Sequence, residues 1–169
     1  MKESSACGTS FLSHLCVEWE NALNSLFSRR EIRVVCARLG IVLSSQGGML
    51  KKILPFFKLG LGSRVGSGEQ WMSWISLEDL VSALLFTLDH PSLSGVFNFT
   101  SPNPLTNKEF TEYLCHLCHK KPFFPIPSWL LKIALGESAQ ELLLSSVRAL
   151  PEKLLLSNFV FKNKNYFSI

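Results

Sequence analysis

The sequence predicts an α/β fold, in which parallel strands alternate with helices before a mostly helical last third. Two observations predict it. Short β-branched segments alternate with segments of helical periodicity as far as about residue 118, and the remainder has a mainly helical pattern. Apolar residues make up 47% of the 169 residues and charged residues 18%, so the chain has enough apolar material to bury a core.

The first elements follow from periodicity. A helix is expected over residues 10–27, because apolar residues from Phe11 to Trp19 and beyond recur at helical spacing. Residues 31–38 are short and β-branched, which predicts a buried strand with parallel neighbours. A Gly-Gly pair then breaks the chain before a second helix, expected over residues 49–57.

The middle of the chain begins with a glycine-rich loop at residues 60–69. A short strand is expected over residues 71–75. Ser76 and Asp79 can cap the helix that runs from there to His90.

Residues 94–100 predict another strand. Thr106 and Glu109 have the T-x-x-E spacing of a capping box, so a helix is expected to follow. Helices are expected over most of residues 128–157, and the aromatic, basic tail after them is expected to be strand or coil.

Composition also limits the partners. The net charge is only +4 and the basic residues are spread along the chain, so we expect no nucleic-acid partner. No apolar run approaches the roughly 20 residues that span a bilayer, and no signal-peptide core follows the polar first residues. We therefore expect a cytoplasmic chain without a membrane partner. Five cysteines without a framework spacing indicate reduced thiols.

Three segments resemble one known family. Residues 38–48 contain Arg-Leu-Gly-Ile-Val-Leu before the Gly-Gly pair, and residues 59–80 contain Gly-Ser-Arg-Val-Gly-Ser-Gly-Glu-Gln-Trp-Met-Ser-Trp-Ile-Ser. The third segment covers residues 135–154. Together they are similar to the epimerase-like branch of the extended short-chain dehydrogenases/reductases, some of whose members are labelled cell division inhibitors. The resemblance covers nearly the whole chain.

The resemblance implies the C-terminal part of a Rossmann-type NAD(P)-binding fold. Residues 1–100 would form the end of the Rossmann-like domain, and residues 101–169 a small, mostly helical substrate lobe. The family's opening strand, G-x-x-G-x-x-G loop and helix have no counterpart in this sequence. The resemblance therefore implies NAD or NADP as cofactor, weak binding of it by this chain alone, and the missing N-terminal half as a candidate partner.

The glycines of residues 60–69 do not replace that loop. A phosphate cradle needs a strand directly before it and a helix directly after it, because backbone N–H groups and the helix N-terminus bind the anion together. Neither element is expected beside these glycines. A connection that lets the backbone pass close to a ligand or a sheet edge is the favoured interpretation.

Candidate cofactor contacts lie at the end of the first predicted strand, because the carboxyl ends of Rossmann strands face the cofactor. By the resemblance, the residues that border the nicotinamide would be Arg38, Leu39, Gly40, Ile41 and Val42. For Arg38, a surface ion pair is an equally good interpretation.

Candidate substrate contacts are Gln70, Trp71, Ser73 and Trp74. Family members that bind sugar nucleotides often hold the pyrophosphate with an arginine, and Met72 takes that position here. Paired tryptophans could stack on a ring or sugar face. Strand alternation places Trp71 with Ser73 and Met72 with Trp74, and core packing is the favoured interpretation for Trp74.

The family's usual proton-transfer pair, Tyr-x-x-x-Lys, is absent. Neither Tyr113 nor Tyr166 has a lysine four residues on, and the resemblance places Leu12 and Cys16 at the two positions. The catalytic residues are therefore unknown. The sequence predicts the substrate-side portion of an NAD(P)-dependent epimerase- or oxidoreductase-like protein, incomplete and weakly active or inactive alone. The alternative is a non-catalytic binding or regulatory protein that retains the fold.

One short motif competes with this interpretation. Cys115-His-Leu-Cys-His119 matches the attachment pattern of c-type haem, and its cysteines could ligate a metal. The motif lies in a predicted amphipathic helix, and no second Cys/His pair stands at zinc-finger spacing. Helix packing with solvent-facing histidines is therefore favoured, and no metal is expected.

Overall fold

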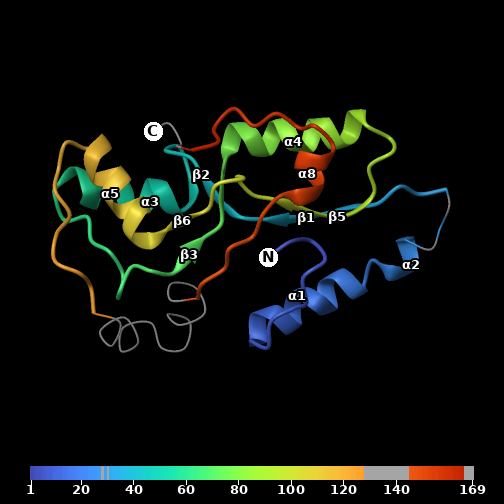
Figure 1. Ribbon diagram of the computed structural model, residues 1–169, viewed down its shortest axis with the longest axis horizontal. Coiled ribbons are helices and arrows are strands. Elements are labelled where there is room, and N and C mark those ends of the chain that lie inside the picture. The colour runs from blue at the N-terminus through green and yellow to red at the C-terminus, as the bar shows by residue number, and fades with distance from the viewer. Residues whose placement is uncertain (28, 30, 128–144, 166–169) are drawn as a thin grey trace.

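The computed structural model describes residues 1–27, 29, 31–127 and 145–165. Helices and strands alternate within them as an α/β fold requires (Figure 1). In chain order, the elements are α1 (Phe11–Asn21), α2 (Asn24–Phe27), β1 (Val35–Leu39), β2 (Ile41–Leu43), α3 (Gly48–Lys58), β3 (Trp71–Met72), β4 (Trp74–Ser76), α4 (Leu77–Asp89), β5 (Gly95–Phe99), β6 (Leu105–Thr106), α5 (Asn107–Leu117) and α8 (Glu152–Leu156).

The described strands form three pairs. β1 and β5 are parallel, from Val35 opposite Gly95 to Leu39 opposite Phe99. β2 continues the direction of β1 but pairs with β4, again in parallel, and β3 pairs with β6 in antiparallel fashion. The parallel pairing expected of an α/β fold is therefore confirmed.

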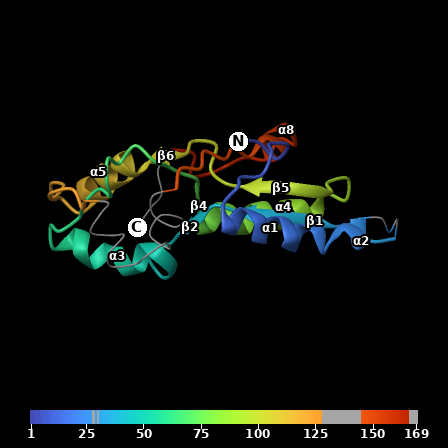
Figure 2. The ribbon, with the colours of Figure 1, turned by 90° about the horizontal axis from the view of Figure 1, so that it is seen from below.

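Helices lie on both sides of the β1–β5 pair. Figure 1 shows α4 on one side of the pair and α1 on the other, with α8 close to β5 and α4. α3 and α5 lie together at the opposite end of the molecule, which Figure 2 shows from below. The step from β1 to β2 therefore lies between the two groups of helices.

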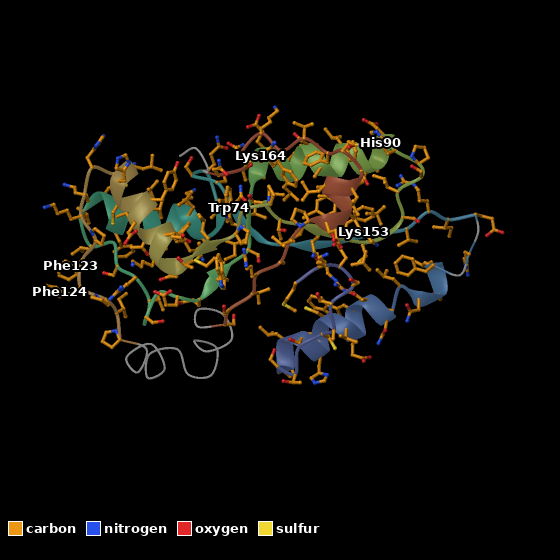
Figure 3. All side chains as sticks on the ribbon, in the orientation of Figure 1. Trp74, His90, Phe123, Phe124, Lys153 and Lys164 are labelled. Atoms are coloured by element: carbon orange, nitrogen blue, oxygen red, sulfur yellow. The ribbon has the colours of Figure 1, made fainter. Side chains whose placement is uncertain are left out.

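Two apolar clusters form the described core. The first joins β2, α3, β4 and α5 and consists of Leu43, Leu50, Phe57, Trp74, Phe110, Leu114 and Cys115. The second joins β4, α4, β5 and the end of the chain and consists of Ile75, Leu80, Ala83, Phe97, Phe99, Leu154, Phe159 and Phe161. Trp74, labelled in Figure 3, is 1% exposed in the first cluster, and the next residue, Ile75, is 0% exposed in the second, so β4 contributes to both clusters.

Side-chain caps begin the two best-formed helices. The Ser76 hydroxyl accepts a hydrogen bond from the Asp79 N–H at the start of α4. At the start of α5, Thr106 and Glu109 form the reciprocal capping box that their spacing predicts. Both capping predictions are confirmed, because each side chain supplies the acceptor that a first-turn N–H lacks within the helix.

The first two helices, α1 and α2, differ from the other described helices because none of their residues is buried. Phe11 and Trp19 are 72% and 68% exposed. The helix predicted over residues 10–27 is two helices, since α1 ends at Asn21 and the four-residue α2 follows. The first strand also begins later than predicted, at Val35 instead of residue 31.

The largest correction concerns residues 145–150, which were expected to be helical and are extended. Their polar groups form hydrogen bonds with Trp71 of β3 and with Ser73, not with one another as in a helix. For example, Val147 N–H donates to Trp71 O at 3.2 Å. The helices predicted within residues 128–144 lie outside the described residues. The domain division at residue 100 stays a prediction. None of the described helices has the length and apolar character to cross a membrane.

Candidate functional site

Gly40 marks the point at which the first strand changes partner. Its N–H donates to Phe99 O at 3.1 Å, as the last bond of the β1–β5 pair, and the next N–H, from Ile41, donates to Ser73 O at 2.8 Å. A Cβ atom at Gly40 would lie 2.8 Å from Ser73 O and 3.0 Å from the Thr100 methyl carbon. A glycine is therefore required for the backbone to pass between two sheet partners. In α/β folds, ligands bind where strand connections diverge.

Two cavities meet at this point. The α1 cavity, of about 1150 Å³, lies between the N-terminal residues with α1 and one face of β1. The α3–α5 cavity, of about 680 Å³, lies between α3, α5 and β3. Both walls share Leu39, Gly40, Ser73, Ser145 and Val147. The carboxyl end of β1 is therefore the border between the two cavities.

The extended segment of residues 145–149, which we call the strap, crosses this border. The Ser73 hydroxyl donates to Val147 O at 2.7 Å and accepts from Ala149 N–H at 2.8 Å. Trp71 N–H donates to the Ser146 hydroxyl at 3.0 Å. Ser73 thus holds the strap with both its donor and its acceptor capacity.

Arg38 faces the α1 cavity and forms an ion pair across it. Its Nε and Nη2 atoms each donate to the Glu20 carboxylate at 2.6 Å, in a bidentate geometry. These hydrogen bonds lower the pKa of Glu20, and the carboxylate in turn raises the pKa of Arg38. Because α1 buries none of its residues, this pair is a principal tie between α1 and β1. The ion-pair interpretation of Arg38 is confirmed.

The other predicted cofactor residues are distributed around the border. Leu39 is 56% exposed and lines both cavities together with Gly40, while Ile41 lines the α3–α5 cavity. Val42 packs against the second apolar cluster and lines neither cavity. The structure therefore brings Arg38, Leu39 and Gly40 together at the α1 cavity.

The predicted substrate residues separate into two groups. Trp71 and Ser73 line the α3–α5 cavity, and the Arg148 guanidinium lies 4.5 Å from the Trp71 ring centroid. Gln70 and Trp74 line neither cavity. The Gln70 amide donates to Val65 O at 3.1 Å, and the Trp74 indole donates to Asn103 O at 2.9 Å from within the core. The core-packing interpretation of Trp74 is confirmed.

Several wall residues were not identified from the sequence. Leu12 and Cys16, considered only as replacements for the proton-transfer pair, line the α1 cavity. Met49, Ile53 and Phe110 line the α3–α5 cavity from α3 and α5. The amphipathic pattern of these helices was the only sequence signal for these wall residues. It shows which face of a helix is apolar, but it does not distinguish a cavity wall from a face packed on another helix.

The glycine-rich loop forms part of the α3–α5 wall. β3 follows it instead of a helix, as expected, so it lacks the helix N-terminus that a phosphate cradle needs. Gly66 N–H donates to Ile126 O at 2.9 Å, and Val65 N–H donates to the Asn107 side chain at 2.8 Å. Hydrogen bonds to distant residues therefore fix the loop in place.

The Cys115–His119 motif ends α5. Cys115 is 1% exposed in the first apolar cluster, and burial raises the pKa of its thiol. Within the described parts of the chain, no three His, Cys, Asp or Glu side chains converge as metal ligands would. The packing interpretation of Cys115 is the one that agrees with its surroundings.

Comparison with known proteins gives one family-model match. The family described as "Domain of unknown function (DUF1731)" matches residues 126–165, which include the strap and α8. Curated relatives match the chain more extensively. Epimerase family protein MT2273 of Mycobacterium tuberculosis is 46% identical over 94% of this chain and 52% of its own length. The chloroplastic SDR39U1 homolog of Arabidopsis thaliana is 37% identical over 96% of this chain and 46% of its own length.

Solved structures agree with these relatives. The human epimerase family protein SDR39U1 (isoform 2), solved with NADPH, superimposes with a TM-score of 0.89 at 30% identity, over 96% of this chain and 55% of that one. A nucleoside-diphosphate sugar epimerase from Corynebacterium glutamicum gives a TM-score of 0.76 at 29% identity, over 98% of this chain and 31% of that one. The chain spans about half the length of the curated relatives that it matches.

Proposed function

We propose that this chain, which belongs to the epimerase family of the short-chain dehydrogenases/reductases, supplies the substrate side of a nicotinamide-dependent site. In this proposal the dinucleotide-binding side belongs to a polypeptide segment that corresponds to the other half of the longer relatives. The chain alone is then weakly active or inactive as an epimerase or oxidoreductase.

The observation that carries the proposal is the meeting of two cavities at the carboxyl end of β1. Leu39, Gly40 and Ser73 belong to both walls, so the two cavities adjoin at these residues. A hydride transfer needs adjoining sites for cofactor and substrate, because donor and acceptor carbons must come into direct contact. The location at the carboxyl end of a parallel strand also agrees with where α/β folds bind ligands.

The open edge of β1 supports a second polypeptide half. Among the described strands, β1 pairs only with β5, so its other edge has no strand partner within that part of the chain. Parallel sheets are normally built from several strands with both faces covered, and an exposed edge is a template for further pairing. The roughly twofold greater length of the relatives supplies a segment that could occupy this edge.

The residues of this chain fit one end of the cofactor. Gly40 lines the α1 cavity, and this cavity is large enough for a nicotinamide and ribose. The glycine-rich loop does not fit the pyrophosphate, because a strand follows it. Arg38, Leu39 and Gly40 would therefore border a nicotinamide, which when bound supplies or accepts a hydride. The human relative's NADPH favours NADP over NAD.

Calorimetric titration of NADPH into the chain alone tests the incompleteness directly. We expect no saturable heat in the micromolar range, because the chain contributes no cradle for the pyrophosphate. A micromolar dissociation constant for the chain alone would contradict the proposal.

A non-catalytic binding or regulatory protein is the second candidate. Leu12 and Cys16 favour it, because they line the α1 cavity at the positions that the family resemblance gives to the tyrosine and lysine. Leu12 cannot donate a proton as the family's tyrosine does, and Cys16 carries no positive charge as the family's lysine does. The test is NADPH consumption by a reconstituted two-half protein against a panel of aldehydes and ketones. Turnover of any one of them rules this candidate out.

A further inference from the structure

The α3–α5 cavity has an apolar wall to which α3, α5 and β3 all contribute. Met49 and Ile53 reach it from α3, Phe110 from α5, and Trp71 and Met72 from β3. Its volume of about 680 Å³ lies within the range of sites for small molecules, roughly 300–1,000 Å³. The cavity is therefore large enough for a substrate-sized ligand.

No described residue in this wall carries a charge. Two basic side chains lie close to wall residues without lining the cavity themselves. The Arg148 guanidinium lies against the Trp71 ring, and Arg148 is not part of the wall. Arg64 lies on the glycine-rich loop, close to Gly68, and is not part of the wall either. A buried diphosphate needs arginine or lysine side chains or a cradle of backbone N–H groups, because unpaired charge in an apolar cavity is very unfavourable.

The polar groups of the wall are largely engaged within the protein. The Asn107 side chain accepts from Val65 N–H at 2.8 Å and donates to the Met72 sulfur at 3.6 Å. The Ser63 hydroxyl donates to Leu61 O at 3.2 Å. Ser73 uses its hydroxyl on the strap. The cavity therefore offers a ligand mainly dispersion contacts and removal of apolar surface from water.

We propose that the α3–α5 cavity binds a neutral, largely apolar small molecule, and that the substrate belongs to this class and not to the sugar nucleotides. A sugar nucleotide would bring two phosphate charges and many hydroxyl groups to a wall that offers few free partners. The assignment as substrate rests on the proposed function, because only the shared border at Gly40 and Ser73 connects this cavity to a cofactor. Binding to the cavity is independent of that assignment.

The experiment uses the unmodified chain without cofactor and the neutral fluorophore N-phenyl-1-naphthylamine, which becomes bright in apolar surroundings. We expect a saturable increase in fluorescence with one probe bound per chain. A neutral aliphatic ketone should displace the probe, and UDP-glucose in large excess should not. Absence of saturable binding, or displacement by UDP-glucose, overturns the proposal.

Variants locate the probe. Ile53→Trp fills the cavity from α3 and should weaken probe binding about tenfold or more, because the added ring occupies the same space. Val147→Trp does so from the strap, where the side chain is 43% exposed, so it carries little risk to folding. Circular dichroism and urea unfolding establish that each variant is folded.

The matched control is Leu85→Gln, because exposed apolar surface can also bind such a probe. Leu85 is 55% exposed on α4 and lines neither cavity. We expect this variant to bind the probe as the unmodified chain does. Loss of binding in Leu85→Gln with retention in folded Ile53→Trp or Val147→Trp would place the probe on α4 and overturn the proposal. Failure of the proposed function would instead appear in the NADPH titrations.

Discussion

At the scale of single residues, Gly40 determines whether the first strand can change partner. A Cβ atom added to Gly40 would collide with the backbone carbonyl oxygen of Ser73. That oxygen already accepts a hydrogen bond from Ile41 N–H. Backbone cannot move aside without loss of that bond. The site border therefore depends on the absence of one methyl group.

Gly40→Ala should destabilise the chain by roughly 1–3 kcal/mol, the usual cost of forcing extra volume into a packed region. The control is Gly8→Ala. A Cβ there would also meet an atom at 2.8 Å, but that atom is the Ser13 hydroxyl oxygen on a partly exposed, rotatable side chain. Urea unfolding should show a change within about 0.5 kcal/mol for the control, as for ordinary surface substitutions. Equal losses in both variants would contradict the assigned role of Gly40.

The Arg38–Glu20 pair gives a prediction about pH. The two hydrogen bonds from Arg38 hold the pKa of Glu20 below its ordinary value. Because the folded-state pKa is the lower one, the stabilisation is fully present above the ordinary glutamate pKa of about 4.3 and is lost as pH falls through the folded-state value.

Glu20→Gln should therefore lower the free energy of unfolding by roughly 0.5–1.5 kcal/mol at neutral pH, and the difference should shrink towards zero in acid. Urea unfolding of both proteins across this pH range measures the effect. Glu18→Gln, at an exposed position on the same helix, should show no such loss at neutral pH. If the loss in free energy of unfolding in Glu20→Gln persisted unchanged in acid, the Arg38–Glu20 pair would not be its cause.

Sequence reasoning at this scale worked where a short-range rule applied. Strand alternation correctly separated Trp71 and Ser73, which both bond to the strap, from Met72 and Trp74, which both pack on the first apolar cluster. It could not predict that Arg38 would meet Glu20, 18 positions earlier, because that contact depends on how α1 lies against β1.

At the scale of elements, the sequence predicted those with local signals and missed those held by distant partners. α4 and α5 were predicted from their caps and periodicity, and both caps are present. The strap was predicted to be helical, because residues 142–150 are rich in leucine and contain no breaker. Its bonds to Trp71 and Ser73, over 70 positions away, favour an extended conformation over that propensity.

Asp79 links two elements that are far apart in sequence. Its carboxylate is 1% exposed and accepts N–H groups from Lys162 at 2.8 Å and Asn163 at 2.9 Å, as well as the Ser76 hydroxyl at 3.1 Å. It therefore fastens the C-terminal segment to the first turn of α4, where the helix dipole also favours negative charge.

Asp79→Asn should cost roughly 2–4 kcal/mol, because its NH₂ group would face a backbone N–H and leave a buried donor unpaired. Amide hydrogen exchange should also become faster at Lys162 and Asn163. Glu78→Gln is the control. Glu78 also pairs with Lys162, but both side chains are more than half exposed, so the free energy of unfolding should change far less than in Asp79→Asn. Unchanged exchange in Asp79→Asn would contradict this role.

At the scale of the whole molecule, apolar surface remains uncovered in the described structure. α4 exposes Leu77, Val81, Leu84, Leu85 and Leu88 at helical spacing on the side away from its buried residues. α1 exposes Phe11 and Trp19, and β1 has an open edge within the described strands. Contiguous apolar surface of this kind marks interaction sites, and these features agree with a chain that is completed by a further segment.

The sequence predicted the α/β class and the parallel strands, because hydrophobic periodicity records which segments are buried. It could not predict the two cavities or their common border. Both depend on how α3, α5 and the strap approach one another, and these segments are separated by long stretches of chain. The family resemblance indicated the end of β1 as a candidate site, whereas the apolar α3–α5 cavity beside it was found only in the structure.

Reconstitution of the NADPH site tests the central claim most directly. The first half of the Mycobacterium tuberculosis relative is fused ahead of this chain, and NADPH binding is measured by calorimetry for the fusion, for the same fusion with Gly40→Val, and for the chain alone. We expect micromolar binding by the fusion, binding at least about tenfold weaker for Gly40→Val because a side chain there collides with Ser73 O and displaces the cavity border, and none by the chain alone. Equal binding by the chain alone and the fusion, or no loss in Gly40→Val, would contradict the account.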